Sequence, residues 1–241
     1  MLFHTTRGQM IAIAICVFGL TTASLAQPED DTWHYGFKGG VNYSSIGDVQ
    51  TTIIPSVFGV QTYTASEDRR LGYTAGFFVY HRFRNSRFAV QPQVSFSARG
   101  GDFNYTDIED LEYKIGFNYQ YVDFSVLMKV YPAAGFHFAV GPEIGLQVAG
   151  TNLTYTSNMP ELGPDLQIQQ SLREVLKGRN DIGVLVGVGY DFDFGLMLEI
   201  QYRFGITDVI ETQANGFNFI ENTNRSSSVQ LTVGYALPFW N

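Results

Sequence analysis

The sequence has almost no cysteine. Its only one, Cys16, lies in an apolar run from Met10 to Leu20, and Ile15 stands before it where a lipid-anchored protein would have a small residue. The chain after this run contains no thiol, which excludes a disulfide framework, a thiolate metal site and a cysteine nucleophile from that part. Its stability must come from backbone pairing and side-chain packing.

Long apolar runs are also missing. Met10–Leu20 is shorter than the roughly 20 residues of a membrane-spanning helix, and no later segment reaches that length. With Arg7 before it and Ser24-Leu25-Ala26 after it, the run predicts a cleaved secretory signal peptide at residues 1–26. Residues 27–32 then form a short N-terminal tail. If the exported chain enters a membrane, it must do so with strands.

Basic residues are scarce as well. The predicted signal peptide contains Arg7 and no acid, so the exported chain has 15 − 1 = 14 Lys and Arg against 23 Asp and Glu. Its formal charge is therefore 14 − 23 = −9. Nucleic-acid partners are recognised by basic surfaces, so this balance argues against nucleic acid as a partner.

What the sequence does have is alternation, most clearly in Ile182–Phe204. Apolar residues take the even positions before and after Asp191–Gly195, and glycine and polar residues take most of the odd ones. Period two predicts a β-hairpin with its turn at Asp191–Gly195. Each arm has about ten residues, which is the length of a tilted strand that crosses a bilayer. The hairpin alone fits a soluble β-sandwich equally well, so the rest of the chain must decide.

The same alternation predicts six further strands. In the second of them His81 shares the outward face and Arg82 the inward one, a choice supported by pairing Phe83 with Phe88. Pro92 and Pro142 lack a ladder donor, so each predicts a bulge. The six strands are Trp33–Tyr43, Leu71–Phe83, Phe88–Arg99, Tyr119–Tyr131, Phe136–Ala149 and Ser228–Leu237.

Long and short connections alternate between these eight strands. This asymmetry predicts an all-β fold, an eight-stranded antiparallel up-and-down transmembrane β-barrel over residues 33–241, with four long extracellular loops and tight periplasmic turns. Within one loop, Asp165–Lys177 has apolar residues near helical spacing and predicts a short helix. We expect this helix to pack on its own barrel mouth rather than on a partner. The predicted loops are Ser44–Arg70, Gly100–Asn118, Gly150–Asp181 and Thr207–Ser227.

The two faces of the predicted barrel carry different residues. Inward charges should form a lumen charge network, because an unpaired buried charge is costly. If Lys129 lies beside His137, then Asp123 lies beside Glu143. The predicted network is Arg82, Asp123, Lys129, Glu143, Glu199 and Arg203. Aromatic residues near the turns and chain ends predict an interfacial girdle of Trp33, Phe83, Phe88, Tyr131, Phe136, Tyr190, Phe239 and Trp240.

Five blocks of the sequence resemble a known family in their order and spacing. They are YGFKGGVNYSS at Tyr35–Ser45, FAVQPQVSFSARGG at Phe88–Gly101, VDFSVLMKVYP at Val122–Pro132, FAVGPEIGL at Phe138–Leu146 and DIGVLVGVGYDF at Asp181–Phe192. The chain resembles the outer-membrane β-barrel domain family, the PorT-like "porin family" small barrels. It departs from that pattern at Asp123, where a Glu is expected, and at Asn241, which follows Phe239-Trp240. The resemblance implies an outer-membrane location and leaves the specific role open.

The sequence is compatible with several functions. The leading prediction is a non-enzymatic, monomeric outer-membrane barrel that contacts lipid and, through its loops, an envelope or surface protein. The alternatives are a small porin, an accessory of an outer-membrane secretion system and a soluble lipocalin-like carrier. No catalytic, cofactor-binding or metal-binding residue is predicted, since His34 and His137 show no triad spacing. The acids around Asp102–Glu112 match no calcium-loop spacing, and a solvated acidic loop is the simpler interpretation.

Overall fold

The computed structural model describes residues 33–47, 53–56, 59–62, 64–106, 112–148, 152–158, 165–212 and 224–237. The predicted signal peptide and tail, Phe239 and Trp240 lie outside these ranges. In the part of the chain that is described, no helix combines the length and the apolar character needed to span a membrane.

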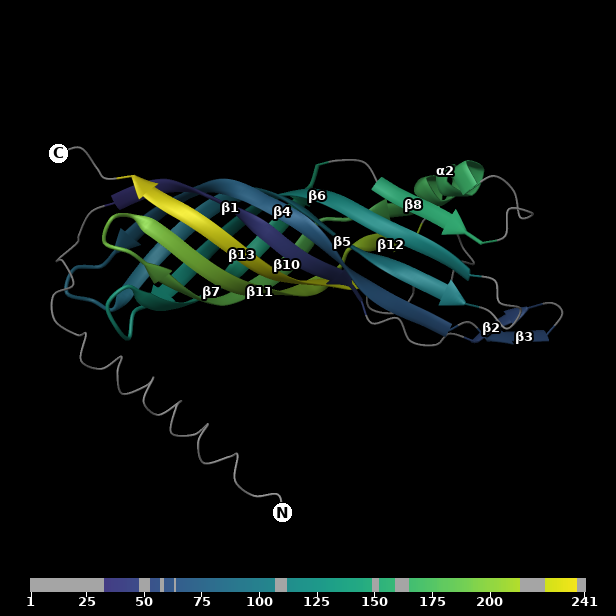
Figure 1. The fold of residues 1–241 in the computed structure, drawn as a ribbon, viewed down its shortest axis with the longest axis horizontal. Helices are drawn as coiled ribbons and strands as arrows, with labels where there is room; N and C mark the ends of the chain where they lie inside the picture. The colour runs from purple at the N-terminus through teal and green to yellow at the C-terminus, as the bar shows by residue number, and fades with distance from the viewer. Residues whose placement is uncertain are drawn as a thin grey trace, which may run out of the picture.

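Eight antiparallel strands close into a ring, which confirms the predicted fold. Their order is β5-β4-β1-β13-β11-β10-β7-β6, and pairing between β5 and β6 closes the circle. The first and last strands lie side by side, with Tyr35 opposite Leu237 (Figure 1). The strands are β1 Trp33–Ile46, β4 Thr64–Arg82, β5 Phe88–Thr106, β6 Glu112–Val130, β7 Phe136–Gln147, β10 Asp181–Asp191, β11 Leu196–Asp208 and β13 Arg225–Leu237.

Side chains alternate between the outside and the lumen, as a period of two requires. In β11, Ile200 is 53 % exposed whereas Arg203 is fully buried. The predicted parity of β4 is confirmed, because Phe77 is exposed and Phe78 is buried. The predicted pairing of β4 with β5 is confirmed as well, with Arg82 opposite Ala89.

The two prolines do not form bulges, so that prediction is wrong. Pro92 lies opposite Val126 within an unbroken β5–β6 register, and Pro142 lies opposite Val184 within an unbroken β10–β7 register. The irregularity between β4 and β5 falls elsewhere, between Arg69 and Thr74. A missing N–H removes one rung of a ladder, and the neighbouring rungs are sufficient to hold the register here.

Three strands continue well beyond the ring, which corrects the predicted loops Ser44–Arg70 and Gly100–Asn118, and a further strand corrects part of Gly150–Asp181. β4, β5 and β6 each have 19 residues, and β8 (Asn152–Ser157) pairs with the outer part of β6. These four strands form a sheet that projects from one end of the barrel (Figure 1). Two further short strands, β2 (Ile53–Ser56) and β3 (Gly59–Thr62), pair near its tip.

The alternation does not predict the projecting sheet, because the apolar face of the strands changes sides there. In the ring part of β5 the apolar residues Val94 and Phe96 face outward, whereas further along Phe103 and Tyr105 are buried on the lumen side. The outward positions there hold Asp102 and Asn104. The period of two is kept along β5, but no single face of the strand is apolar over its whole length.

The predicted helix is confirmed as α2, Asp165–Val175. Leu172 and the following Leu176 are buried against the projecting sheet. α2 also binds the outer edge of β8, where Gln169 accepts from the Tyr155 N–H at 3.2 Å and the Arg173 Nε donates to the Leu153 carbonyl at 2.9 Å. The helix therefore packs on its own chain, beside the short strands β9 (Leu176–Gly178) and β12 (Ile210–Thr212).

Candidate functional site

The lumen contains two groups of buried charges. The first, the arginine cluster, consists of Arg99, Asp123, Glu143, Asp181 and Arg203, and it lies toward the projecting sheet. Arg99 binds Asp123 at 2.7 Å and Glu143 at 2.8 Å, and Arg203 binds Glu143 at 2.7 Å and Asp181 at 2.9 Å. The residues come from β5, β6, β7, β10 and β11, so the ion pairs tie five strands together across the lumen.

Small neighbours complete the arginine cluster. Ser97 donates to Asp123 at 2.5 Å, and Ser226 donates to Asp181 at 2.6 Å. A Cβ at Gly145 would lie 2.7 Å from Arg99 Nη2, and one at Gly183 would lie 2.8 Å from Arg203 Cζ. These two glycines leave the space that the guanidinium groups occupy.

The second group, the lysine cluster, consists of Lys38, Lys129, His137, Asp191 and Glu199. Lys129 Nζ lies 2.7 Å from Glu199 and 3.6 Å from Asp191, and Lys38 Nζ lies 4.0 Å from Glu199. The two ring nitrogens of His137 face Asp191 at 3.5 Å and Glu199 at 3.4 Å. Asp191 begins the turn between β10 and β11, so this group lies toward the short turns.

Amides and apolar side chains occupy the lumen near the two clusters. Gln91 donates to Gln93 at 3.1 Å, and Gln93 donates to Ser125 at 2.7 Å. Gln201 donates to Glu199 at 3.1 Å. A small apolar group of Leu127, Ala139 and Leu185 is buried as well.

Five of the six predicted network residues lie in these two groups, three of them in the arginine cluster and two in the lysine cluster. The sixth, Arg82, is not part of either cluster, since its guanidinium carbon lies 4.5 Å from the centre of the Tyr131 ring. Arg99 takes the role expected of Arg82. The condition set for the β6–β7 register is not met, because Lys129 lies opposite Ala139 rather than His137, and Asp123 lies opposite Gly145.

Sequence reasoning missed Arg99, Lys38, His137, Asp181 and Asp191 as network members. Arg99, Lys38 and His137 stand on the predicted inward faces of their strands, so parity alone was a usable signal for them. Asp181 and Asp191 lie at strand ends, where parity is weakly defined by the pattern. Only the closed ring shows that the side chains converge.

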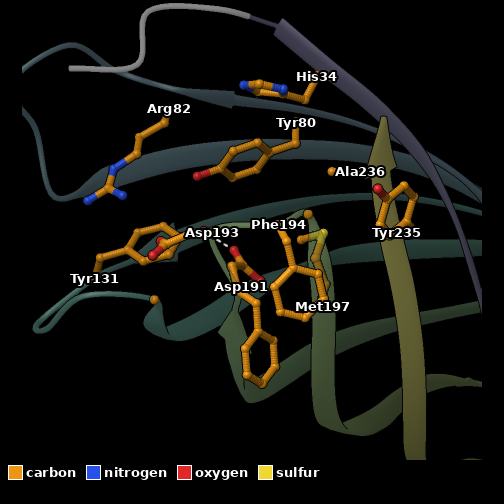
Figure 2. Close-up of a pocket in the computed structure, with 13 residues that line it drawn as sticks. His34, Tyr80, Arg82, Tyr131, Asp191, Asp193, Phe194, Met197, Tyr235 and Ala236 are labelled. Carbon is orange, nitrogen blue, oxygen red and sulfur yellow. Dashed lines mark hydrogen bonds between the residues drawn. The ribbon is translucent and has the colours of Figure 1, made fainter. Parts of the chain in front are cut away.

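A cavity of about 380 Å³ opens at the short-turn end. Figure 2 shows His34, Tyr80 and Arg82 on one side of it, opposite Tyr131 and Asp191, with Phe194, Met197 and Tyr235 along the remaining wall. The Tyr131 hydroxyl donates to Asp191 at 2.5 Å, and this carboxylate both lines the cavity and belongs to the lysine cluster.

The opposite end of the lumen is covered by a hydrophobic cluster. Its aromatic residues include Phe103, Phe117, Tyr119 and Tyr155. Leu172 of α2, Leu176 of β9 and Ile210 of β12 belong to the same cluster. Tyr105 belongs to this cluster beyond the outward apolar band of the barrel, and burial raises the pKa of its phenol to about 12.

The outer surface of the ring is apolar. Every strand of the ring carries exposed aliphatic and aromatic side chains on its outer face. An apolar surface of this extent is typical of contact with a membrane or a partner rather than with water. Of the predicted girdle, Trp33, Phe83, Phe88 and Tyr190 are exposed at the short-turn end and Phe136 is half-buried. The girdle prediction is wrong for Tyr131, which is 2 % exposed. It stands two residues after the inward Lys129 and therefore faces the lumen.

A closed antiparallel barrel with an apolar outside and a charged inside defines the class of small β-barrels that sit in a membrane. Residues 25–211 match the outer membrane protein beta-barrel domain family. The chain belongs to that family.

Solved outer-membrane structures cover most of the chain at low identity. Neisserial surface protein A is 13 % identical, and the match includes 85 % of this chain and 97 % of the Neisserial chain with a TM-score of 0.40. Ail of Yersinia pestis is 8 % identical, covers 85 % and 99 %, and also gives 0.40. OprG of Pseudomonas aeruginosa is 12 % identical, covers 87 % and 98 %, and gives 0.38. No curated protein matches the sequence.

The side chains of the two clusters form ion pairs and hydrogen bonds with one another. Within the described ranges, no group of three or more His, Cys, Asp and Glu side chains could hold a metal ion. Ser97 and Ser226 bind Asp123 and Asp181, and each of those aspartates also pairs with an arginine. Of the acids in the predicted acidic loop, Asp107, Glu109 and Asp110 lie outside the described part, whereas Asp102 pairs with Arg70 and Lys114.

Proposed function

We propose that this protein is a non-enzymatic integral outer-membrane barrel whose lumen is plugged and whose projecting sheet contacts surface or envelope partners. The observation that carries the proposal is the pair of buried charge clusters that bridge the lumen. Outer-membrane location is supported by the family, and export by a cleaved signal peptide remains a prediction from the sequence.

The plug follows from the size of the ring and from the charges inside it. An eight-stranded barrel has an interior just wide enough for side chains to fill. Here the inward positions hold long side chains, and Arg99, Lys129 and Arg203 are at most 2 % exposed. Each ion pair would have to open before water or a solute could pass, and the buried charges left behind would lose their partners.

The projecting sheet supports a role in contacts outside the membrane. Its outward face is polar, with Arg70 3.1 Å and Lys114 2.9 Å from the shared acid Asp102. Such a surface suits water rather than lipid. By the rule that outer-membrane barrels place short turns in the periplasm, this sheet would stand on the cell surface.

Single-channel recording in planar bilayers tests the plug. The unmodified protein should give no steady open state, because the clusters close the lumen. Glu199→Leu should create openings, since Lys129 and Lys38 would lose their common partner and draw in water. The control is Val186→Ile, which changes an outward side chain and should stay closed.

A steady conductance of the unmodified protein would contradict the proposal and favour the porin alternative. The soluble carrier alternative needs apolar residues inside and polar ones outside, and the ring has the reverse distribution. The secretion-accessory alternative rests on the sequence resemblance alone.

A further inference from the structure

The turn between β4 and β5 concentrates positive charge in an acidic protein. Arg82, Arg84 and Arg87 fall within six positions of a chain that has 15 basic and 23 acidic residues in total. The neighbouring short turn at Pro132–Gly135 has no charged residue, and the third one contains Asp193. One sector of the short-turn end is therefore basic while another is acidic.

This turn is held in a defined shape. Phe83 N–H donates to the Phe88 carbonyl and Ser86 N–H to the Phe83 carbonyl, both at 3.1 Å. The Phe88 N–H also donates to Ser86 Oγ at 3.0 Å, and Asn85 takes a left-handed φ of 52°. Tyr131 N–H ties the Arg87 carbonyl to β6 at 2.8 Å. The backbone thus presents the exposed Arg84 and Arg87 from fixed positions.

Aromatic residues on either side of the turn set its depth relative to the membrane. Phe83 and Phe88, 46 % and 48 % exposed, end the two strands on the outward face. Trp33 is also exposed there and stacks on His81 with ring centres 4.5 Å apart. Rings of this kind sit at the boundary between acyl chains and head groups, so side chains one residue further out reach the phosphates.

From these features we infer that the Arg84–Arg87 turn binds the head groups of anionic phospholipids. A guanidinium group pairs with phosphate through two parallel hydrogen bonds. In a zwitterionic lipid the cation of the head group competes with the guanidinium group for the phosphate, so the pairing is weaker than with an anionic lipid. Arg82 does not take part, because its side chain turns inward over Tyr131. Since the chain as a whole is acidic, the attraction is confined to this sector and is not a consequence of net charge.

Trp33 supplies a local reporter of the bound lipid. The second tryptophan is replaced by Trp240→Phe, and the protein is refolded into vesicles of phosphatidylcholine and phosphatidylglycerol in which one lipid at a time carries brominated chains. Quenching of Trp33 then measures which lipid occupies the sector next to the turn. We expect brominated phosphatidylglycerol to quench more than its share of the bilayer predicts, and less so at high salt.

The decisive variant is Arg84→Gln with Arg87→Gln. Each arginine near an anionic surface contributes on the order of a five-fold preference, so the double variant should lose most of the enrichment. Arg84→Lys with Arg87→Lys should keep a large part of it. The matched control is Arg179→Gln with Arg225→Gln, which removes two exposed charges at the opposite end and should leave the enrichment unchanged.

Three results would overturn the inference. The first is an undiminished preference for phosphatidylglycerol in the Arg84, Arg87 double glutamine variant. The second is an equal loss in the control at the opposite end, which would show a general charge effect. The third needs no variant: quenching by phosphatidylglycerol in the parent protein that equals its share of the bilayer, or that does not change with salt.

Discussion

Replacing Arg99 by Met should destabilise the barrel more than replacing Glu143 by Gln, although both residues make two bonds in the arginine cluster. The cluster has three acids and two bases. Arg99→Met leaves Asp123, Glu143 and Asp181 with Arg203 as the only base. Glu143→Gln leaves two acids with two bases, and each arginine keeps a partner, Asp123 for Arg99 and Asp181 for Arg203.

The magnitudes follow from what each change leaves unpaired. Removing one partner of a buried ion pair costs about 3–5 kcal/mol. Arg99→Met should reach the upper part of that range, because it removes the close pairs with Asp123 and Glu143 and the longer one, at 3.9 Å, with Asp181. Glu143→Gln keeps an acceptor oxygen and a similar shape, so its cost should be about 1–3 kcal/mol, the value for poorly satisfied buried hydrogen bonds. The expected difference is therefore about 2 kcal/mol.

Reversible denaturant unfolding in lipid vesicles would measure both free energies, with Val186→Ile as the control for a change on the outward face. We expect the order Arg99→Met, Glu143→Gln, Val186→Ile from most to least destabilised. An equal effect of the first two variants, or none, would mean that water screens the lumen charges. Charge balance would then not control the stability of the arginine cluster, and the lumen would not be plugged.

Two further predictions concern the whole molecule. The protein should fractionate with the outer membrane, resist alkaline extraction and migrate differently on gels before and after heating; recovery in the soluble periplasmic fraction would refute a membrane barrel. A cysteine placed at Lys114 should be labelled by an impermeant reagent added to whole cells and one at Asn85 should not, and the opposite pattern would show that the barrel is inverted.

The sequence predicted the parts of the fold that depend on one repeating pattern. Eight strands, the parity of β4, its pairing with β5 and the helix α2 all follow from periodicity and from single turns. Such features are local, or they join neighbouring strands through a short connection. The pattern failed where the apolar residues of β5 change sides between Phe96 and Phe103.

The site was predictable in kind but not in its pairings. Parity alone indicated that Asp123, Glu143 and Arg203 point inward, but their partners depend on the stagger between strands. The two-residue difference in the β6–β7 register moves Asp123 from Glu143 to Gly145 and opens space for Arg99. A pattern along one strand contains no information about that stagger, because it is fixed by the closure of the ring.

The contact between α2 and β8 also limits strand pairing between two molecules of this protein. Ring closure leaves no open edge in the barrel, but the projecting sheet ends at β8, where backbone groups could pair with a strand of another chain. Gln169 and Arg173 occupy the N–H of Tyr155 and the carbonyl of Leu153 at that edge. At β8, α2 thus uses backbone groups that another strand would otherwise bind. Because α2 is a helix, it does not itself present a further strand edge.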